Sequence, residues 1–334
     1  MIYEYAVDPK LIVTLGDFPD LAWWLVSQLG NDTGCVVSEY PKDIDRAIYK
    51  ELKEQIRAAS EDEKIHLQKK RAKIEEIAAR IKVRHPVGMA KRKNSIPWTG
   101  IFSDEHQRHP FDFVLAESGA MEGQRAIPNV FEWLRDPDSH LHQSPSSLLV
   151  SRTADELSNA VAPILKNARE ITFIDPYFLP YNNSFCDAFK YYLRRIPCST
   201  AIRGALPRSV TMICNANAKF TNQAGPPSAY SEVDFKAACE SELPQIIPSG
   251  ILLRIRRARE KRGESNWHKL HNRFLLTDIG GIAFGHGIDC RSQPGDSSKD
   301  TLSLLSSVAV REIKNMYNPT ENFFDWSEPV IEIL

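Results

Sequence analysis

The feature that most constrains the fold is a regular alternation of helical and strand patterns after about residue 147. Helices are expected over roughly 153–168, 184–195 and 230–241. Short apolar runs between and after them predict strands: EITFIDPYF ending at Asp175-Pro176, then 209–216, 250–258, HNRFLLT, GGIAFG and TLSLLSS. Helices that alternate with short apolar strands are typical of an α/β domain with a mixed sheet.

The first part of the chain has a different pattern. Residues 42–85 contain neither glycine nor proline and are dense in charge, which predicts helices over about 43–58 and 61–82. Ser60 and Glu63 have capping-box spacing, so the two helices are expected to form a hairpin or a short antiparallel coiled-coil arm. Turn-forming residues at 136–147 then predict a domain junction, with an N-terminal region over 1–146 and a second domain over 147–334.

Composition excludes several classes of protein. The chain of 334 residues is 42% hydrophobic and has a net charge of −1, which argues against a disordered chain or a wholly basic nucleic-acid binder. No apolar run approaches the roughly 18–20 residues that a membrane helix needs, and the start of the chain lacks a signal-peptide pattern. A cytoplasmic protein without membrane insertion is therefore expected.

The segment WHKLHNRFLLTDIGGIAFGHGID, residues 267–289, carries the strongest chemical pattern. On a strand, His271 and Arg273 would point to the same side. An imidazole beside a permanent cation suits attack on a phosphodiester, because the ring nitrogen is a nucleophile and the guanidinium binds non-bridging oxygens. Asp278 follows five residues later and is a candidate for orienting an imidazole. Gly285 would let the backbone approach a phosphate.

These residues resemble the phospholipase D superfamily, whose signature is HxKxxxxD followed after about six residues by GSxN. The resemblance covers about residues 147–334 and is greatest to divergent single-motif members that accompany prokaryotic antiviral defence genes. It implies a phospholipase D-like mixed-sheet α/β domain and a metal-independent phosphodiesterase that needs no cofactor. One histidine would attack phosphorus and a second would protonate the leaving oxygen, through a phosphohistidine that water then hydrolyses.

Two positions depart from the signature. Arg273 stands where the family usually has lysine, and it keeps the positive charge with a different geometry. His286 replaces the serine of GSxN, and Ile288 occupies its asparagine position. His286 either donates to the phosphate in place of serine, or the pocket has lost its chemistry.

The resemblance also bears on oligomeric state. The family's reaction uses two motifs, whereas this chain contains one. We therefore expect a homodimer in which the site lies on a two-fold axis and His271 of each subunit takes one of the two roles.

A local concentration of positive charge precedes the motif. Residues 251–273 contain six Arg and two Lys against two Glu. This segment is expected to line the approach to the site and to bind substrate through Arg254, Arg256, Arg257, His268 and Lys269, which favours nucleic acid as the partner. The alternative is a solvated basic loop. Trp267 is a candidate for stacking on a base, or for ordinary packing.

The sequence therefore leaves two functions open. The first is a nuclease of an antiviral defence system, with His271, Arg273 and Asp278 as catalytic residues. The second is an inactive adaptor that binds nucleic acid or another defence protein. Asp175 either faces a cleft at the end of its strand or simply forms an Asp-Pro turn. The histidines of HQRH and HLH are interpreted as surface residues, so no metal site is predicted.

Overall fold

The chain divides into two compact units, Ile2–Pro145 and Ser146–Leu334, each of which is described by itself. The computed structural model describes residues 3–18, 20–21, 25, 35–38, 44–80, 83–84, 113–116, 146–168, 170–197, 208–217, 219–220, 228–229, 231–261, 268–290 and 297–334. Trp267 and the histidines of HQRH and HLH lie outside these residues.

The first unit contains a small parallel sheet. Its four described strands have the order β3-β2-β1-β4, with β1 at Tyr3–Val7, β2 at Cys35–Ser38, β3 at Val83–Arg84 and β4 at Phe113–Leu115. Helix α1 (Pro9–Leu15) follows β1 directly, because the Asp8 carboxylate caps its first turn by accepting from the Lys10 amide.

Two long helices complete this unit, α3 at Ile44–Ala58 and α4 at Glu61–Arg80. Between them the Glu63 carboxylate accepts hydrogen bonds from both the amide and the hydroxyl of Ser60, so α4 begins where the capping-box spacing places it. Lys70, almost fully buried on α4, donates to Asp17 just after α1. The predicted charged helices therefore belong to a unit that also contains a sheet.

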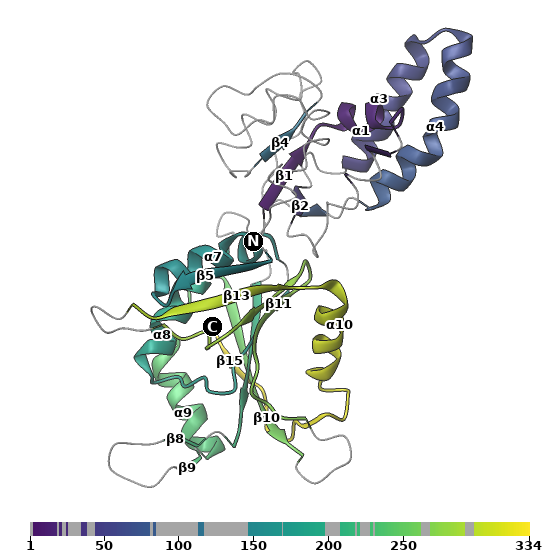
Figure 1. The fold of residues 1–334 in the computed structure, drawn as a ribbon. Helices are drawn as coiled ribbons and strands as arrows, with labels where there is room; N and C mark the ends of the chain where they lie inside the picture. Colours follow the sequence, from purple (N-terminus) through teal and green to yellow (C-terminus); the bar gives the residue numbers. More distant parts are fainter. Residues whose placement is uncertain are drawn as a thin grey trace. The chain divides into compact units, whose positions relative to one another are not determined.

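The second unit is built on a large mixed sheet, which confirms the α/β class (Figure 1). Among the described residues it has nine strands, ordered β14-β10-β7-β6-β11-β12-β13-β5, with β15 also paired to β10. The bounds are β5 Ser147–Ser151, β6 Ile171–Ile174, β7 Arg208–Asn215, β10 Ile251–Glu260, β11 Arg273–Thr277, β12 Gly281–Phe284, β13 Lys299–Leu305, β14 Phe324–Asp325 and β15 Ile331–Ile333. β6, β7 and β10 are parallel, and the other pairs are antiparallel. A separate two-stranded ribbon pairs β8 (Lys219–Phe220) with β9 (Ser228–Ala229).

Helices cover both faces of the large sheet. Helices α7 (Ala154–Asn167), α8 (Asn183–Arg194) and α9 (Glu232–Glu242) lie on one face, and α10 (Ser307–Met316) lies on the other (Figure 1). Thr153, Asn182, Ser231 and Ser306 cap these four helices through side-chain oxygens that accept from backbone amides.

Alternate residues of the central strands separate the core into two halves. Phe173 of β6 packs against Phe189 of α8, and Phe284 of β12 packs against Tyr192 of the same helix. On the α10 face, Ile174, Ile213, Phe274 and Leu276 pack with Tyr317 and Phe324 in one cluster. Because successive strand residues face opposite sides, each central strand contributes to both halves.

Several elements were not predicted from the sequence. They include α1, β5, β8, β9, α10, the short strands β14 and β15, and the individual strands of the first unit, which was expected to be either α/β or largely helical. One expected strand is shorter than predicted, because β11 begins at Arg273 and leaves His271 in the connection before it.

Candidate functional site

Polar residues gather at one end of the second unit's sheet. β6 ends at Ile174 beside the start of β11, because Phe274 pairs with Ile174. β11 in turn starts beside the end of β12, where Arg273 pairs with Phe284. This register brings Asp175, Arg273 and the loop 285–289 to one end of the sheet, which we call the candidate site.

Arg273 is positioned by an aromatic ring. Its guanidinium carbon lies 4.8 Å from the ring centroid of Tyr177, in cation–π geometry. Its buried Nε makes no hydrogen bond with the described residues. Because Arg273 is half-buried and in a fixed orientation, it can bind a phosphate oxygen at this end of the sheet.

Asp175 ties the candidate site together. Its carboxylate is 1% exposed and accepts from the amides of Tyr177 at 2.9 Å and Ile288 at 3.1 Å. Asp175 therefore stabilises the turn after β6 through Tyr177 and holds the loop after β12 through Ile288. Burial raises the pKa of this carboxyl from 3.8 to about 6, although the two backbone hydrogen bonds and the charge of Arg273 lower it.

Two glycines allow this loop to pass close to carboxylates. A Cβ on Gly285 would lie 2.8 Å from Oδ1 of Asp300, and a Cβ on Gly287 would lie 2.5 Å from Oδ1 of Asp289. Gly285 was expected to let the backbone approach a phosphate, but here the nearest group is a protein carboxylate. The close approach of Gly285 to Asp300 holds the next residue, His286, beside this carboxylate.

His286 is oriented by a buried carboxylate. Oδ1 of Asp300, on β13, lies 3.1 Å from Nδ1 of His286 and also accepts from the His286 amide at 3.0 Å. Asp300 is fully buried, whereas the imidazole is 63% exposed. When Nδ1 donates to Asp300, Nε2 carries a lone pair that faces outward. This histidine–aspartate pair can accept or deliver a proton at the surface of the site.

A second buried cation anchors the same loop. Arg152, at the end of β5, donates from Nη2 to the backbone oxygen of Asp289 at 3.2 Å and to its Oδ1 at 2.6 Å. Sequence reasoning missed Arg152, Asp289 and Asp300 as site residues. They come from separate strands and loops, and no spacing in the sequence relates them.

His271 lies at the same end of the hairpin as His286. His271 comes two residues before Arg273, and His286 comes two residues after Phe284, the residue that pairs with Arg273. His271 is exposed, and the Leu270 amide before it donates to Glu260 at 3.0 Å, which fixes the connection. Nearby, His268 packs its ring on Phe323 and Lys269 is exposed.

The structure does not place Asp278 with His271. Asp278 lies in the turn between β11 and β12, where it accepts from the Glu170 amide at 3.2 Å. The five residues of β11 separate it from the His271 end, a length of about 16 Å. Asp278 therefore does not orient His271 within the chain, and Asp300 holds a histidine instead.

The basic strand also differs from the expected substrate rim. Arg257 is buried and lies 3.0 Å from Glu328, and its guanidinium stacks on Phe235, so it cannot bind substrate. Arg254 pairs with Glu332 and donates to Ser209. Moreover, β7 and β6 lie between β10 and β11 in the sheet. The arginines of β10 are close to His271 in the sequence, but they do not form one surface with it.

Comparisons with known proteins do not assign a family, because no protein-family model matches the chain and no curated protein matches it. Among the described residues, no helix is long and apolar enough to cross a membrane. Within the same residues, no group of three His, Cys, Asp or Glu side chains is placed to hold a metal ion.

The raised pKa of Asp175 predicts a specific dependence of stability on pH. Between about pH 4 and 6 the folded chain keeps a proton that the unfolded chain has released, so stability falls as pH rises through this window. The loss from this group reaches about 3 kcal/mol. In urea unfolding at pH 4.5 and 7.5, Asp175→Asn should lack this component, while Asp278→Asn should keep it. Identical pH profiles for wild type and Asp175→Asn would contradict the prediction.

Proposed function

We propose that the second unit is a phospholipase D-like domain and that the chain is a metal-independent phosphodiesterase, most simply a nuclease. Support for the fold comes from the mixed sheet with helices on both faces and from Arg273 at the start of a central strand, with His271 two residues before it. The resemblance in residues 267–289 extends the proposal to a role in prokaryotic antiviral defence.

The observation that carries this proposal is that two histidines and an arginine occur at the same end of the β11–β12 hairpin. Arg273 begins β11 and His271 lies in the connection just before it, while His286 follows β12 and contacts Asp300. In this proposal His271 attacks phosphorus while Arg273 binds the non-bridging oxygens. The P–O bond to the leaving oxygen breaks, and an imidazolium supplies the proton that this oxygen needs.

The second imidazole of the proposed site can come from either of two sources. In the expected homodimer, His271 of a second subunit protonates the leaving oxygen. Alternatively His286 of the same chain does so, since it lies at the same end of the hairpin as His271 and its ring is oriented by Asp300. The second arrangement needs no dimer.

The test of the proposed activity is cleavage of end-labelled DNA and RNA, single- and double-stranded, in excess EDTA. We expect turnover to persist in EDTA, because the proposed reaction uses imidazoles and a guanidinium rather than a metal ion. Cleavage that stops in EDTA and returns with Mg²⁺ would contradict the proposed mechanism.

A second candidate is an inactive adaptor that binds nucleic acid or a partner protein. The acidity of the candidate site favours the form that binds a partner protein there, since the carboxylates of Asp175, Asp289 and Asp300 oppose the binding of a phosphodiester. Salt-sensitive binding of nucleic acid without turnover of any phosphodiester would support the adaptor.

A further inference from the structure

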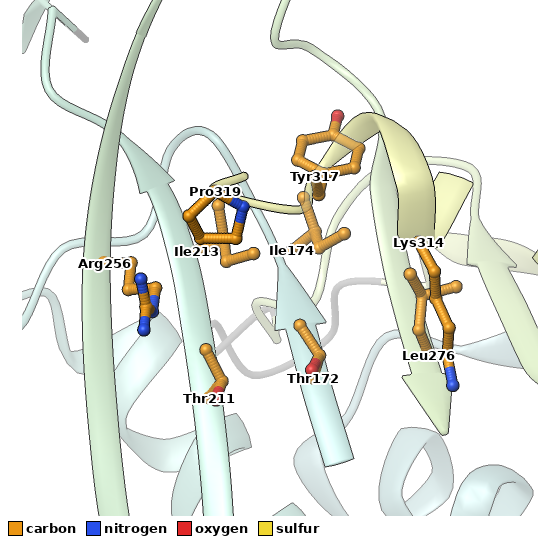
Figure 2. A pocket seen from close by; sticks show the side chains of 9 residues that line it. All are labelled: Thr172, Ile174, Thr211, Ile213, Arg256, Leu276, Lys314, Tyr317 and Pro319. Carbon is orange, nitrogen blue, oxygen red and sulfur yellow. The ribbon is translucent and has the colours of Figure 1, made fainter. Parts of the chain in front are cut away.

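A cavity of about 210 Å³ lies on the α10 face of the large sheet (Figure 2). Its floor comes from four adjacent strands, and the end of α10 with the following residues forms one wall. The lining residues are Thr172, Ile174, Thr211, Ile213, Arg256, Leu276, Lys314, Tyr317 and Pro319.

Strand register explains why these residues share one face. Ile174 pairs with Ile213, and Ile213 pairs with Arg256. In the next row, Leu276 pairs with Thr172 and Thr172 with Thr211. Cross-strand partners point to the same side of a sheet, so two hydroxyls and one cation project into the space beneath α10.

Within the part of the chain that the structure describes, no acidic side chain balances the positive charge of this cavity. Arg256 lies at one side and Lys314 at the other, with the two threonines between them (Figure 2). None of the lining residues is acidic, and neither cation has an ion-pair partner among the described residues. By contrast Arg254, on the same face of β10, is neutralised by Glu332 at 2.8 Å.

The shape of the cavity restricts the ligand. Arg256 belongs to β10, and Lys314 covers the β11 side, three strand spacings or about 14 Å away. A ligand that interacts with both sides is therefore larger than a simple inorganic anion. Ile174, Ile213 and Leu276 offer apolar contact between the cations, and the Tyr317 hydroxyl points away from the cavity (Figure 2).

We propose that this cavity binds a small organic phosphate monoester. The Arg256 guanidinium forks onto the phosphate, the Thr211 and Thr172 hydroxyls donate to its oxygens, and the organic group lies over the apolar floor. Lys314 supplies the second positive charge. A tetrahedral phosphate suits this set better than a planar carboxylate, because it presents three acceptor oxygens to donors on several strands.

The cavity is separate from the candidate site. Thr172 and Ile174 face α10, whereas Phe173 between them packs on α8. Arg273 likewise faces the α8 side, since its cross-strand partner Phe284 packs on Tyr192. The proposal therefore does not rest on phosphodiesterase activity.

The test is calorimetric titration of the full chain with ribose 5-phosphate, using ribose and inorganic phosphate as reference ligands. We expect saturable binding of ribose 5-phosphate, with weaker binding of both references. Arg256→Gln should weaken the affinity about tenfold or more, and Lys314→Gln should weaken it about threefold or more. Arg311→Gln, an exposed cation three residues before Lys314 on α10, is the matched control and should change affinity less than twofold.

Three results would overturn the proposal. One is no saturable binding of ribose 5-phosphate by a wild-type chain whose thermal unfolding is cooperative. Another is affinity that Arg256→Gln leaves unchanged. The third is inorganic phosphate binding as tightly as ribose 5-phosphate, because the organic group would then add nothing.

Discussion

His271→Ala is expected to lower the rate of phosphodiester cleavage about a thousandfold or more, measured as initial rate in excess EDTA. The imidazole is proposed to form the bond to phosphorus, and alanine offers no substitute. Substrate affinity should change little, since Arg273 rather than His271 holds the phosphate. Binding measured by fluorescence anisotropy on uncleaved substrate separates the two effects.

Variants of His286 and Asp278 test the roles that the geometry assigns to these two residues. His286→Ala should cost about a hundredfold or more if this residue is the second imidazole. Asp278→Asn should stay within about threefold of wild type, because Asp278 lies at the far end of β11. An inactive Asp278→Asn variant that remains folded would contradict the site described here.

Subunit mixing tests where the second imidazole comes from. When a large excess of His271→Ala protein exchanges subunits with wild type, a site shared between two His271 residues loses its activity. A site that combines His271 and His286 of one chain keeps the activity of the wild-type fraction. Light scattering on the same samples shows whether a dimer is present at all.

Glu328→Gln is expected to destabilise the second unit by about 3–5 kcal/mol, measured by chemical unfolding followed through tryptophan fluorescence. Glu328 and Arg257 are each only 4% exposed and lie 3.0 Å apart, and Arg259 also donates to Glu328. Removing the negative charge deprives the buried Arg257 guanidinium of its carboxylate partner, which is why the expected cost is large.

The matched control, Glu332, lies four residues further on. Glu332 pairs with Arg254 at 2.8 Å, but both side chains are exposed. Water already solvates that pair, so Glu332→Gln should cost less than about 1 kcal/mol. The double variant Arg257→Met, Glu328→Leu should recover much of the lost stability, because it removes both buried charges together. Equal losses for Glu328→Gln and Glu332→Gln would contradict the role assigned to burial.

The basic strand β10 shows that a count of charges along the sequence does not predict which surface each arginine occupies. Residues 251–273 carry a local excess of arginine, and the sequence placed Arg254, Arg256 and Arg257 on one binding surface. In the structure Arg257 neutralises Glu328, Arg254 pairs with Glu332, and Arg256 remains to line a cavity on the α10 face. Each partner is about 70 or more residues away along the chain, and strand alternation sends Arg256 and Arg257 to opposite faces.

The helices and the central strands could be predicted because their signals are local. Apolar periodicity and the capping residues Thr153 and Asn182 define α7 and α8 within a few residues of the same positions, whatever the rest of the chain does. The short strand β5 was missed because its partner, β13, lies about 150 residues later. A five-residue edge strand has no local signal stronger than that of a loop.

From the sequence by itself follow the α/β class, the main helices and strands, and a central strand that includes Arg273. These features depend on residues close together in the sequence, because backbone propensity and side-chain periodicity determine where helices and strands form. Only the tertiary structure decided that Asp300 rather than Asp278 holds a histidine, that Arg152 and Asp175 anchor the loop after β12, and that Arg256 faces a cavity. Strand pairing brings together residues that are far apart in the chain, and sheet register determines which of them meet.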